Sequence, residues 1–514
     1  MSANLFWDKI YENALRYPDR VVVRDAKRDW TWQELLGTGA KYARLAEGAL
    51  ASAPINKVIP VFVDRTGNAV AAILGMILSG RPYAPLSVLQ PQQRIESCFR
   101  SLDADIFIDA SGTYTRESNP FKDIVCLPRQ DIGLDNTPEF LNVPGLHDTL
   151  YVLFTSGSTG EPKGVLANYK NILNTILWSE EIIDWRGDDV IGCATNFFFD
   201  ISQFDLFSSL YFNISLAIYS NPQNVDTVLE ETEHFKITSI FSVPTFFSQL
   251  LRCQGHCRAS TRSLRRIISG GDFFPPSHIL LWMDSRPDIA IYNAWGPTES
   301  SIVNTMHRII EEDRKLLLNG QFVSIGEPNP RMSYVLLDEK EKEVIEPEAR
   351  GEICMLGDCV TQGYLNNPDE TKQAYFSWKD QPAFRTKDIG WFDNKNRLYI
   401  FGRKGSTVKI SGYRIDLGEV EKAVMMEADI YLARTFVVEL QEGIKELWIA
   451  VELHNKESEF DIYNFKKGLR QCLPRYMIPK RVIVYNIIPK NTNGKIDRRF
   501  LAQKVQNELR RESA

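Results

Sequence analysis

The sequence predicts an α/β fold in which short buried strands alternate with helices in stacked layers. Three observations support this. Apolar runs of strand length alternate with segments of helical periodicity up to about residue 330, the following segment is richer in strands and turns, and a compact α/β segment comes after Gly402. The length of 514 residues exceeds the usual size of one domain, so we expect at least two domains.

The elements can be assigned in chain order. In the first part we expect strands at 58–63, 151–154, 190–194, 239–243 and 266–269, and helices at 68–78 and 225–235. In the strand-rich part we expect strands at 333–337, 351–356 and 397–401. In the last part we expect helices at 417–427 and 460–472, and strands at 435–439, 447–453 and 481–484. Gly80 and Pro82 follow the first of these helices and are typical of a helix end.

The composition is that of an ordinary globular protein. Hydrophobic residues make up 44% and charged residues 25%, and the formal net charge is −6. This charge argues against nucleic acid as the main partner, because nucleic-acid-binding domains are usually basic. We identify no signal peptide and no apolar run of the roughly 18 residues that a membrane span needs, and therefore expect a cytoplasmic protein without membrane association. The eight cysteines are scattered, and the tight cluster at 253–257 lacks the second pair expected of a metal site.

Residues 151–164 carry the strongest functional signal. An apolar run leads into a loop of Gly, Ser and Thr that ends in a lysine. Glycines allow the backbone N–H groups to face an anion, while hydroxyl and ammonium groups add donors and charge. The loop lacks the Walker A ending, so it predicts a polyphosphate loop of another kind, with a flexible surface loop as the alternative. The candidate residues are Thr155, Ser156, Gly157, Ser158, Thr159, Gly160 and Lys163.

Two further segments could contact a nucleotide. A Gly-Pro turn brings together Trp295, Thr298 and Glu299. Their side chains suit a purine ring, a phosphate oxygen and Mg²⁺, respectively. Asp388 could accept hydrogen bonds from ribose hydroxyls. The alternatives are an ordinary turn with a buried tryptophan and a solvated aspartate.

The last part of the chain holds two clusters of glycines and cations. Residues 402–419 predict a mobile junction followed by a hairpin. Lys495 directly follows an Asn-Gly pair, which is a strong turn signal, and therefore lies on an exposed tip. A solvated charge is the alternative interpretation of this lysine.

Together these five stretches resemble the adenylate-forming superfamily, specifically the amino-acid adenylation domains of nonribosomal peptide synthetases. The resemblance runs nearly end to end and includes matching motifs at 76–85, 91–94, 196–202, 326–328 and 473–479. It implies a large N-terminal domain of stacked α/β sheets with a small β-barrel-like subdomain, residues 1–402. It also implies a small mobile α/β lid, residues 403–514, that rotates about Gly405 between two half-reactions.

The resemblance implies ATP and Mg²⁺ as cofactors. The loop at 155–163 would hold the β- and γ-phosphates. Thr298 would contact the α-phosphate, Glu299 would bind Mg²⁺, and Lys495 would bridge the substrate carboxylate and the ribose. The other nucleotide-binding residues implied are Gly270, Gly271, Asn293, Ala294, Trp295, Gly296, Asp388 and Arg403.

The chain departs from the family pattern at three positions. Trp295 stands where the family usually has tyrosine, and should still stack on adenine. Lys387 replaces the glycine of the usual Thr-Gly-Asp and places a cation beside Asp388. Gly405 replaces the usual hinge aspartate, which would widen the accessible rotation angles.

The resemblance also implies a substrate pocket. Asp200 would pair with a substrate α-ammonium, and the remaining wall is apolar. A branched aliphatic amino acid (Val, Ile or Leu) fits best, followed by Pro or Phe. The implied pocket residues are Asp200, Ile201, Phe204, Phe241, Ile268, Gly270, Ala294, Ile302 and Val303.

The implied activity is the conversion of an amino acid to aminoacyl-AMP, with transfer to the phosphopantetheine thiol of a separate carrier protein in natural-product biosynthesis. We expect a monomer that is either free-standing or excised from a larger synthetase, because no carrier-domain signature follows Lys495. The alternatives are an acyl-CoA or aryl-acid ligase, a D-alanyl carrier protein ligase and, from a different class, a catalytically silent ATP-binding regulator.

Overall fold

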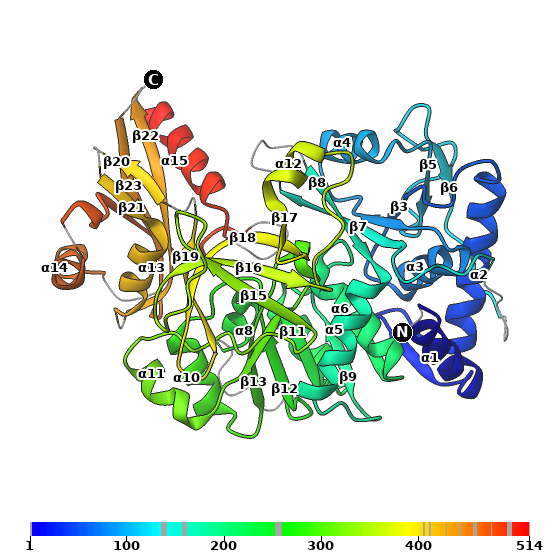
Figure 1. Cartoon of the computed structure of the whole chain (residues 1–514), viewed down its shortest axis with the longest axis horizontal. Helices are drawn as coiled ribbons and strands as arrows, with labels where there is room; N and C mark the ends of the chain where they lie inside the picture. Colours follow the sequence, from blue (N-terminus) through cyan, green and yellow to red (C-terminus); the bar gives the residue numbers. More distant parts are fainter. Residues whose placement is uncertain are drawn as a thin grey trace.

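The computed structural model describes residues 3–134, 141–156, 162–251, 260–404, 407–410, 413–427, 429–441, 444–455, 460–473, 475–490 and 496–512. The described strands form five sheets with helices around them, which confirms the α/β class. In Figure 1 the last elements of the chain and the six-stranded sheet lie on opposite sides of the molecule, with an antiparallel sheet between them in the view.

The largest sheet has eight strands. Its central strands are parallel and buried along their whole length, as expected for strands that are covered on both faces. The strands expected at 190–194, 239–243 and 266–269 are all present in it. In spatial order the strands are β14 (Thr305–Arg308), β13 (Ala290–Trp295), β12 (Arg266–Ser269), β11 (Ser239–Ser242), β9 (Val190–Cys193), β10 (Ser215–Ile218), β1 (Val21–Arg24) and β2 (Asp29–Thr31).

A six-stranded sheet shares one continuous apolar core with the first sheet. Helix α3 (Gly67–Ser79) is buried at every residue, and Gly80 ends it in the left-handed conformation with φ of 73°. In spatial order the strands are β6 (Val125–Leu127), β5 (Ile106–Asp109), β3 (Ile59–Phe62), β4 (Tyr83–Leu86), β7 (Thr149–Ser156) and β8 (Pro162–Asn168).

The strand-rich segment forms an antiparallel sheet with its own apolar cluster. Its edge strands β15 and β17 do not pair with each other, so the expected barrel-like subdomain is an open sheet in the described residues. The strands are β15 (Met332–Leu337), β16 (Gly351–Gly357), β18 (Gln381–Phe392) and β17 (Tyr375–Trp378), with β19 (Leu398–Arg403) paired to β18.

The last part of the chain contains a hairpin and a three-stranded sheet. The hairpin joins β20 (Thr407–Ile410) to β21 (Tyr413–Asp416), and the sheet consists of β22 (Ile430–Gln441), β23 (Ile444–Leu453) and β24 (Arg481–Tyr485). Two apolar clusters here contain only residues beyond 404, and we propose that a C-terminal domain begins near residue 403. Arg434 bridges to Asp272 of the large part at 3.0 Å.

The helices cover these sheets. None of the described helices is both long and apolar enough to cross a bilayer. The remaining helices are α1 (Ala3–Arg16), α2 (Trp32–Ala49), α4 (Gln92–Leu102), α5 (Tyr169–Ile182), α6 (Asp200–Tyr211), α7 (Val225–His234), α8 (Pro244–Leu251), α10 (Pro276–Ser285), α11 (Arg314–Leu318), α12 (Pro368–Ala374), α13 (Leu417–Met425), α14 (Ile462–Cys472) and α15 (Arg498–Glu512), with short 3₁₀ turns η1 (Thr298–Ser300), η2 (Glu311–Asp313) and η3 (Arg475–Met477).

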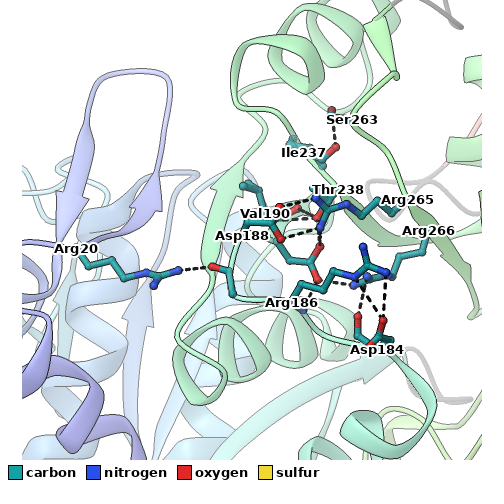
Figure 2. A network of polar contacts seen from close by, with 12 residues as sticks. Arg20, Asp184, Arg186, Asp188, Val190, Ile237, Thr238, Ser263, Arg265 and Arg266 are labelled. Carbon is teal, nitrogen blue, oxygen red and sulfur yellow. Dashed lines mark hydrogen bonds and ion pairs between the residues drawn. The ribbon is translucent and has the colours of Figure 1, made fainter.

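An ionic network joins the starts of β9 and β12 (Figure 2). Arg265 binds Asp188 through two hydrogen bonds, at 2.5 and 2.9 Å. The buried Asp189 accepts from Arg265 at 3.0 Å and from Arg266 at 2.8 Å. Because β9, β11 and β12 are parallel, the network lies at the amino ends of these strands, and it links residues that are 77 apart in the sequence.

Candidate active site

A cavity of about 900 Å³ opens at the carboxyl ends of the parallel strands. The residues that directly follow β11, β12 and β13 all line the cavity; they are Val243, Gly270 and Gly296, respectively. Ligands of open α/β sheets bind at this edge. Asp497 and Arg498 also line the cavity, so a segment close in sequence to Lys495 reaches it, although Lys495 itself lies outside the described residues.

Most of the expected nucleotide-binding residues lie around this cavity. Those that line it are Thr155, Gly270, Gly271, Asn293, Ala294, Trp295, Gly296, Thr298, Glu299, Asp388 and Arg403. Ser156 ends β7, and Lys163 lies in β8, outside the lining. Gly157, Ser158, Thr159, Gly160, Gly405 and Lys495, together with the cysteine cluster at 253–257, lie outside the described residues.

Trp295 and Asp388 are joined directly. The indole Nε1 of Trp295 donates to Asp388 Oδ2 at 3.0 Å, and Arg403 Nε lies 3.7 Å from Asp388 Oδ1. Asp388 lies in strand β18, and each of its carboxylate oxygens faces a nitrogen donor, one from Trp295 and one from Arg403. The preceding Lys387 adopts φ of 64°, the left-handed region that favours glycine.

Asn293 is held at one end of its amide. Its Nδ2 donates to the Ser324 carbonyl at 3.0 Å, while its Oδ1 receives no hydrogen bond from any described residue. Since Asn293 lines the cavity, this oxygen could accept from an exocyclic amino group of a base.

The segment around α12 supplies partners that the sequence analysis missed. Tyr364 OH donates to Glu299 Oε1 at 2.9 Å, and Thr361 donates to the Glu299 carbonyl through N at 3.0 Å and Oγ1 at 2.9 Å. Glu370 Oε2 lies 2.6 Å from Lys163 Nζ. The only cue in the sequence is the turn composition of residues 362–368, because the contacts themselves join residues far apart in the chain.

Asp200 lies at the start of α6, next to the nucleotide-binding candidates. Its Oδ1 accepts from the N–H of Ile201 at 2.8 Å, and its Oδ2 accepts from Thr298 Oγ1 at 2.5 Å. Burial raises the pKa of Tyr151 well above its ordinary value, and the nearby Asp200 carboxylate raises this pKa further. The tyrosine therefore stays neutral behind the carboxylate.

The rest of the expected substrate pocket is apolar. Its lining residues are Ile201, Phe241, Gly270, Ala294, Ile302 and Val303. Phe204 and Ile268 are buried and do not line the cavity. The ring of Phe204 meets Phe241 edge-on at 5.4 Å, so it supports the wall from behind. A Cβ at position 270 would lie 3.0 Å from the Phe241 ring, and glycine therefore keeps this part of the cavity open.

The site fits Mg²⁺ that is held mainly by phosphates. No described group of three or more His, Cys, Asp or Glu residues could enclose a metal ion. Mg²⁺ commonly uses one or two carboxylates together with substrate phosphates, and Glu299 offers a carboxylate at the cavity wall.

The fold and this cavity define an α/β protein with a candidate ligand site at the carboxyl ends of its parallel strands, and comparison with known proteins is more specific. The model of the family described as AMP-binding enzyme matches residues 10–365. The chain belongs to this family and is an adenylate-forming ligase.

Several curated relatives are 26–29% identical to the chain. It is 29% identical to the D-alanine--D-alanyl carrier protein ligase of Bacillus velezensis, with 93% of each protein covered. It is 28% identical to bacitracin synthase 3 of Bacillus licheniformis over 87% of the chain, but it spans only 7% of that protein's length. The solved structure of Klebsiella oxytoca NpsA in complex with 3-hydroxyanthranilyl-AMSN matches with a TM-score of 0.83 at 19% identity, covering 97% of this chain and 99% of that one. This structural likeness agrees with the fold.

Proposed function

We propose that this chain activates an amino acid, with a branched aliphatic side chain as the best fit, by forming aminoacyl-AMP from ATP. It then passes the aminoacyl group to the phosphopantetheine thiol of a separate carrier protein. The proposal agrees with relatives that are named D-alanine--D-alanyl carrier protein ligase and bacitracin synthase 3.

One observation carries the choice of an amino acid. Asp200 lies in the same cavity as Trp295 and Asp388, and its carboxylate is 2.5 Å from the hydroxyl of Thr298. A carboxylate at this place supplies the acceptor that an α-ammonium group needs. A fatty or aryl acid has no such group and would gain no charge-assisted hydrogen bond from this carboxylate.

The residues then have distinct roles in the first half-reaction. A substrate carboxylate oxygen attacks the α-phosphorus, the bond to the bridging oxygen of the β-phosphate breaks, and pyrophosphate leaves. Thr298 would donate to an α-phosphate oxygen, and Lys495 would stabilise the negative charge that develops there. Glu299 would hold Mg²⁺, which would supply positive charge to offset the negative charge of the leaving pyrophosphate. In the second half-reaction the carrier thiolate attacks the acyl carbon and AMP leaves.

Amino-acid-dependent exchange of pyrophosphate into ATP tests the proposal. Exchange is measured with the wild-type chain and with Asp200→Ala. The acids tested are the standard amino acids, D-alanine, a fatty acid and an aryl acid. We expect exchange with branched aliphatic amino acids and its loss in Asp200→Ala. Exchange with only the fatty or aryl acid would refute the proposal, and exchange with only D-alanine would make the chain a D-alanyl ligase.

A further inference from the structure

The side chain of Glu299 is tied to Tyr364. The tyrosine hydroxyl donates to Glu299 Oε1 at 2.9 Å, across 65 residues of chain. Tyr364 is itself anchored, because it forms an isolated antiparallel bridge with Val165 of β8. The contact therefore joins Glu299 in the cavity wall to strand β8.

Glu299 is fixed at its backbone as well. Thr361 donates to the Glu299 carbonyl through both N and Oγ1. With the backbone and Oε1 held, the second oxygen, Oε2, receives no hydrogen bond from any residue that the structure describes. Glu299 thus lines the cavity with one carboxylate oxygen fixed and the other available to a ligand.

Tyr364 is held in place by its neighbours. Its ring packs edge-on against Tyr375 at 5.6 Å, and Lys163 Nζ lies 5.6 Å from its centroid. The ring contacts therefore hold the hydroxyl facing Glu299 Oε1.

We propose that Tyr364 is a positioning residue for the metal–nucleotide complex: by holding Glu299 Oε1, it directs Oε2 to the Mg²⁺ that ATP carries. The inference rests on the proposed function and adds a residue that contacts neither nucleotide nor substrate. A carboxylate that is already held in place binds a cation more tightly, because no side-chain freedom is lost on binding.

The test compares nucleotide binding with and without Mg²⁺. The dissociation constant of a non-hydrolysable ATP analogue is measured by calorimetry in Mg²⁺ and in EDTA for the wild type, Tyr364→Phe and Tyr375→Phe. In Tyr364→Phe the gain in affinity from Mg²⁺ should fall by about fivefold or more, because a hydrogen bond to a charged group is lost, while binding in EDTA stays unchanged.

Tyr375→Phe is the matched control. It also removes a half-buried tyrosine hydroxyl, but one that bonds to Thr361 Oγ1 at 2.8 Å rather than to the carboxylate. Its Mg²⁺-dependent gain should stay within about twofold of the wild type, since the Glu299 side chain keeps its donor. If both variants lost the same part of the Mg²⁺-dependent gain in affinity, the two tyrosines would have only a structural role, and the proposal would be overturned.

A double-mutant cycle with Glu299→Gln completes the test. If Tyr364 acts through the carboxylate, adding Tyr364→Phe to Glu299→Gln should cause no further loss of Mg²⁺ dependence. Additive losses, an unchanged Tyr364→Phe, or equal weakening in Mg²⁺ and EDTA would each overturn the proposal. Pyrophosphate exchange by the wild type is run in parallel. Its absence would contradict the proposed function, whereas normal exchange with an unchanged Tyr364→Phe would contradict only this inference.

Discussion

The hydroxyl of Thr298 donates to the carboxylate of Asp200 at 2.5 Å. The two residues come from different elements, η1 and α6, and under the proposed function they serve different substrates. Thr298 would contact the α-phosphate, whereas Asp200 would bind the ammonium group. In this structure the two side chains are joined by one hydrogen bond, which under the proposed function would link the two substrate sites.

We therefore predict that the amino acid and ATP bind cooperatively. An incoming ammonium group would compete with Thr298 for Asp200 and release the hydroxyl towards the phosphate. The preferred amino acid should raise the affinity for a non-hydrolysable ATP analogue by about fivefold, and the reverse effect must be equal. Calorimetry should show that Thr298→Val loses this coupling and that Thr298→Ser keeps it. A full coupling in the valine variant would contradict the shared hydrogen bond.

Glu370 should limit the affinity for ATP. Lys163 Nζ lies 2.6 Å from Glu370 Oε2, and both side chains are mostly buried, at 12% and 25% exposed. The phosphates would have to compete with this carboxylate for the lysine. Glu370→Gln should therefore tighten ATP binding by about threefold, because Lys163 is then free to form a charge-assisted hydrogen bond with a phosphate. Lys163→Met should weaken ATP binding. Weaker binding in Glu370→Gln would mean instead that the pair orients Lys163 productively.

The sequence predicted the core elements more closely than the polar surroundings of the site. Strand β12 was expected at 266–269 and is found there, because a short apolar run with a glycine after it allows few alternatives. Strand β22 extends from Ile430 to Gln441, well beyond the expected 435–439. Its ends are held by pairing with β23, a long-range interaction that local hydrophobicity does not report.

The candidate site divides in the same way. Asp200, Trp295 and Asp388 were recognised from their motifs, and all three line one cavity. Their mutual contacts could not be predicted, because Trp295 and Asp388 are 93 residues apart and Thr298 and Asp200 are 98 apart. Tyr364 and Glu370 were missed for the same reason, since each makes its contact with a candidate site residue only in the folded chain.

Trp295 should help Asp388 to recognise the ribose. The indole N–H donates to Asp388 Oδ2 at 3.0 Å, a bond that a phenyl ring cannot make. Trp295→Phe keeps an aromatic face for the base but releases the carboxylate. We expect about fivefold weaker binding of ATP, in the range of one hydrogen bond to a charged group, and a smaller change for 2′,3′-dideoxy-ATP. Equal weakening of both nucleotides would assign Trp295 to base stacking alone.

The ionic network at the start of β9 should give an acid-dependent stability (Figure 2). Hydrogen bonds from Arg265 lower the pKa of Asp188 from 3.8 to about 2. Because the folded pKa lies below the unfolded value, the contribution is fully present above pH 4 and is lost as the pH falls towards 2. Asp188→Asn should lower the thermal midpoint at pH 7, and this difference from the wild type should shrink as the pH falls from about 4. A difference that is constant with pH would exclude the charge as its cause.

Lys387 should store backbone strain next to Asp388. Its φ of 64° costs a residue with a side chain about 1–2 kcal/mol, whereas glycine adopts it freely. Lys387→Gly should raise the free energy of unfolding by about 1 kcal/mol, since part of the gain is offset by the greater freedom of glycine in the unfolded chain. Lys387→Ala is the matched control, because it removes the exposed charge and keeps the unfavourable φ, and denaturation with urea should leave it close to the wild type. If the alanine variant gained as much stability as the glycine variant, the cost would come from the cation beside Asp388 and Arg403 rather than from the backbone.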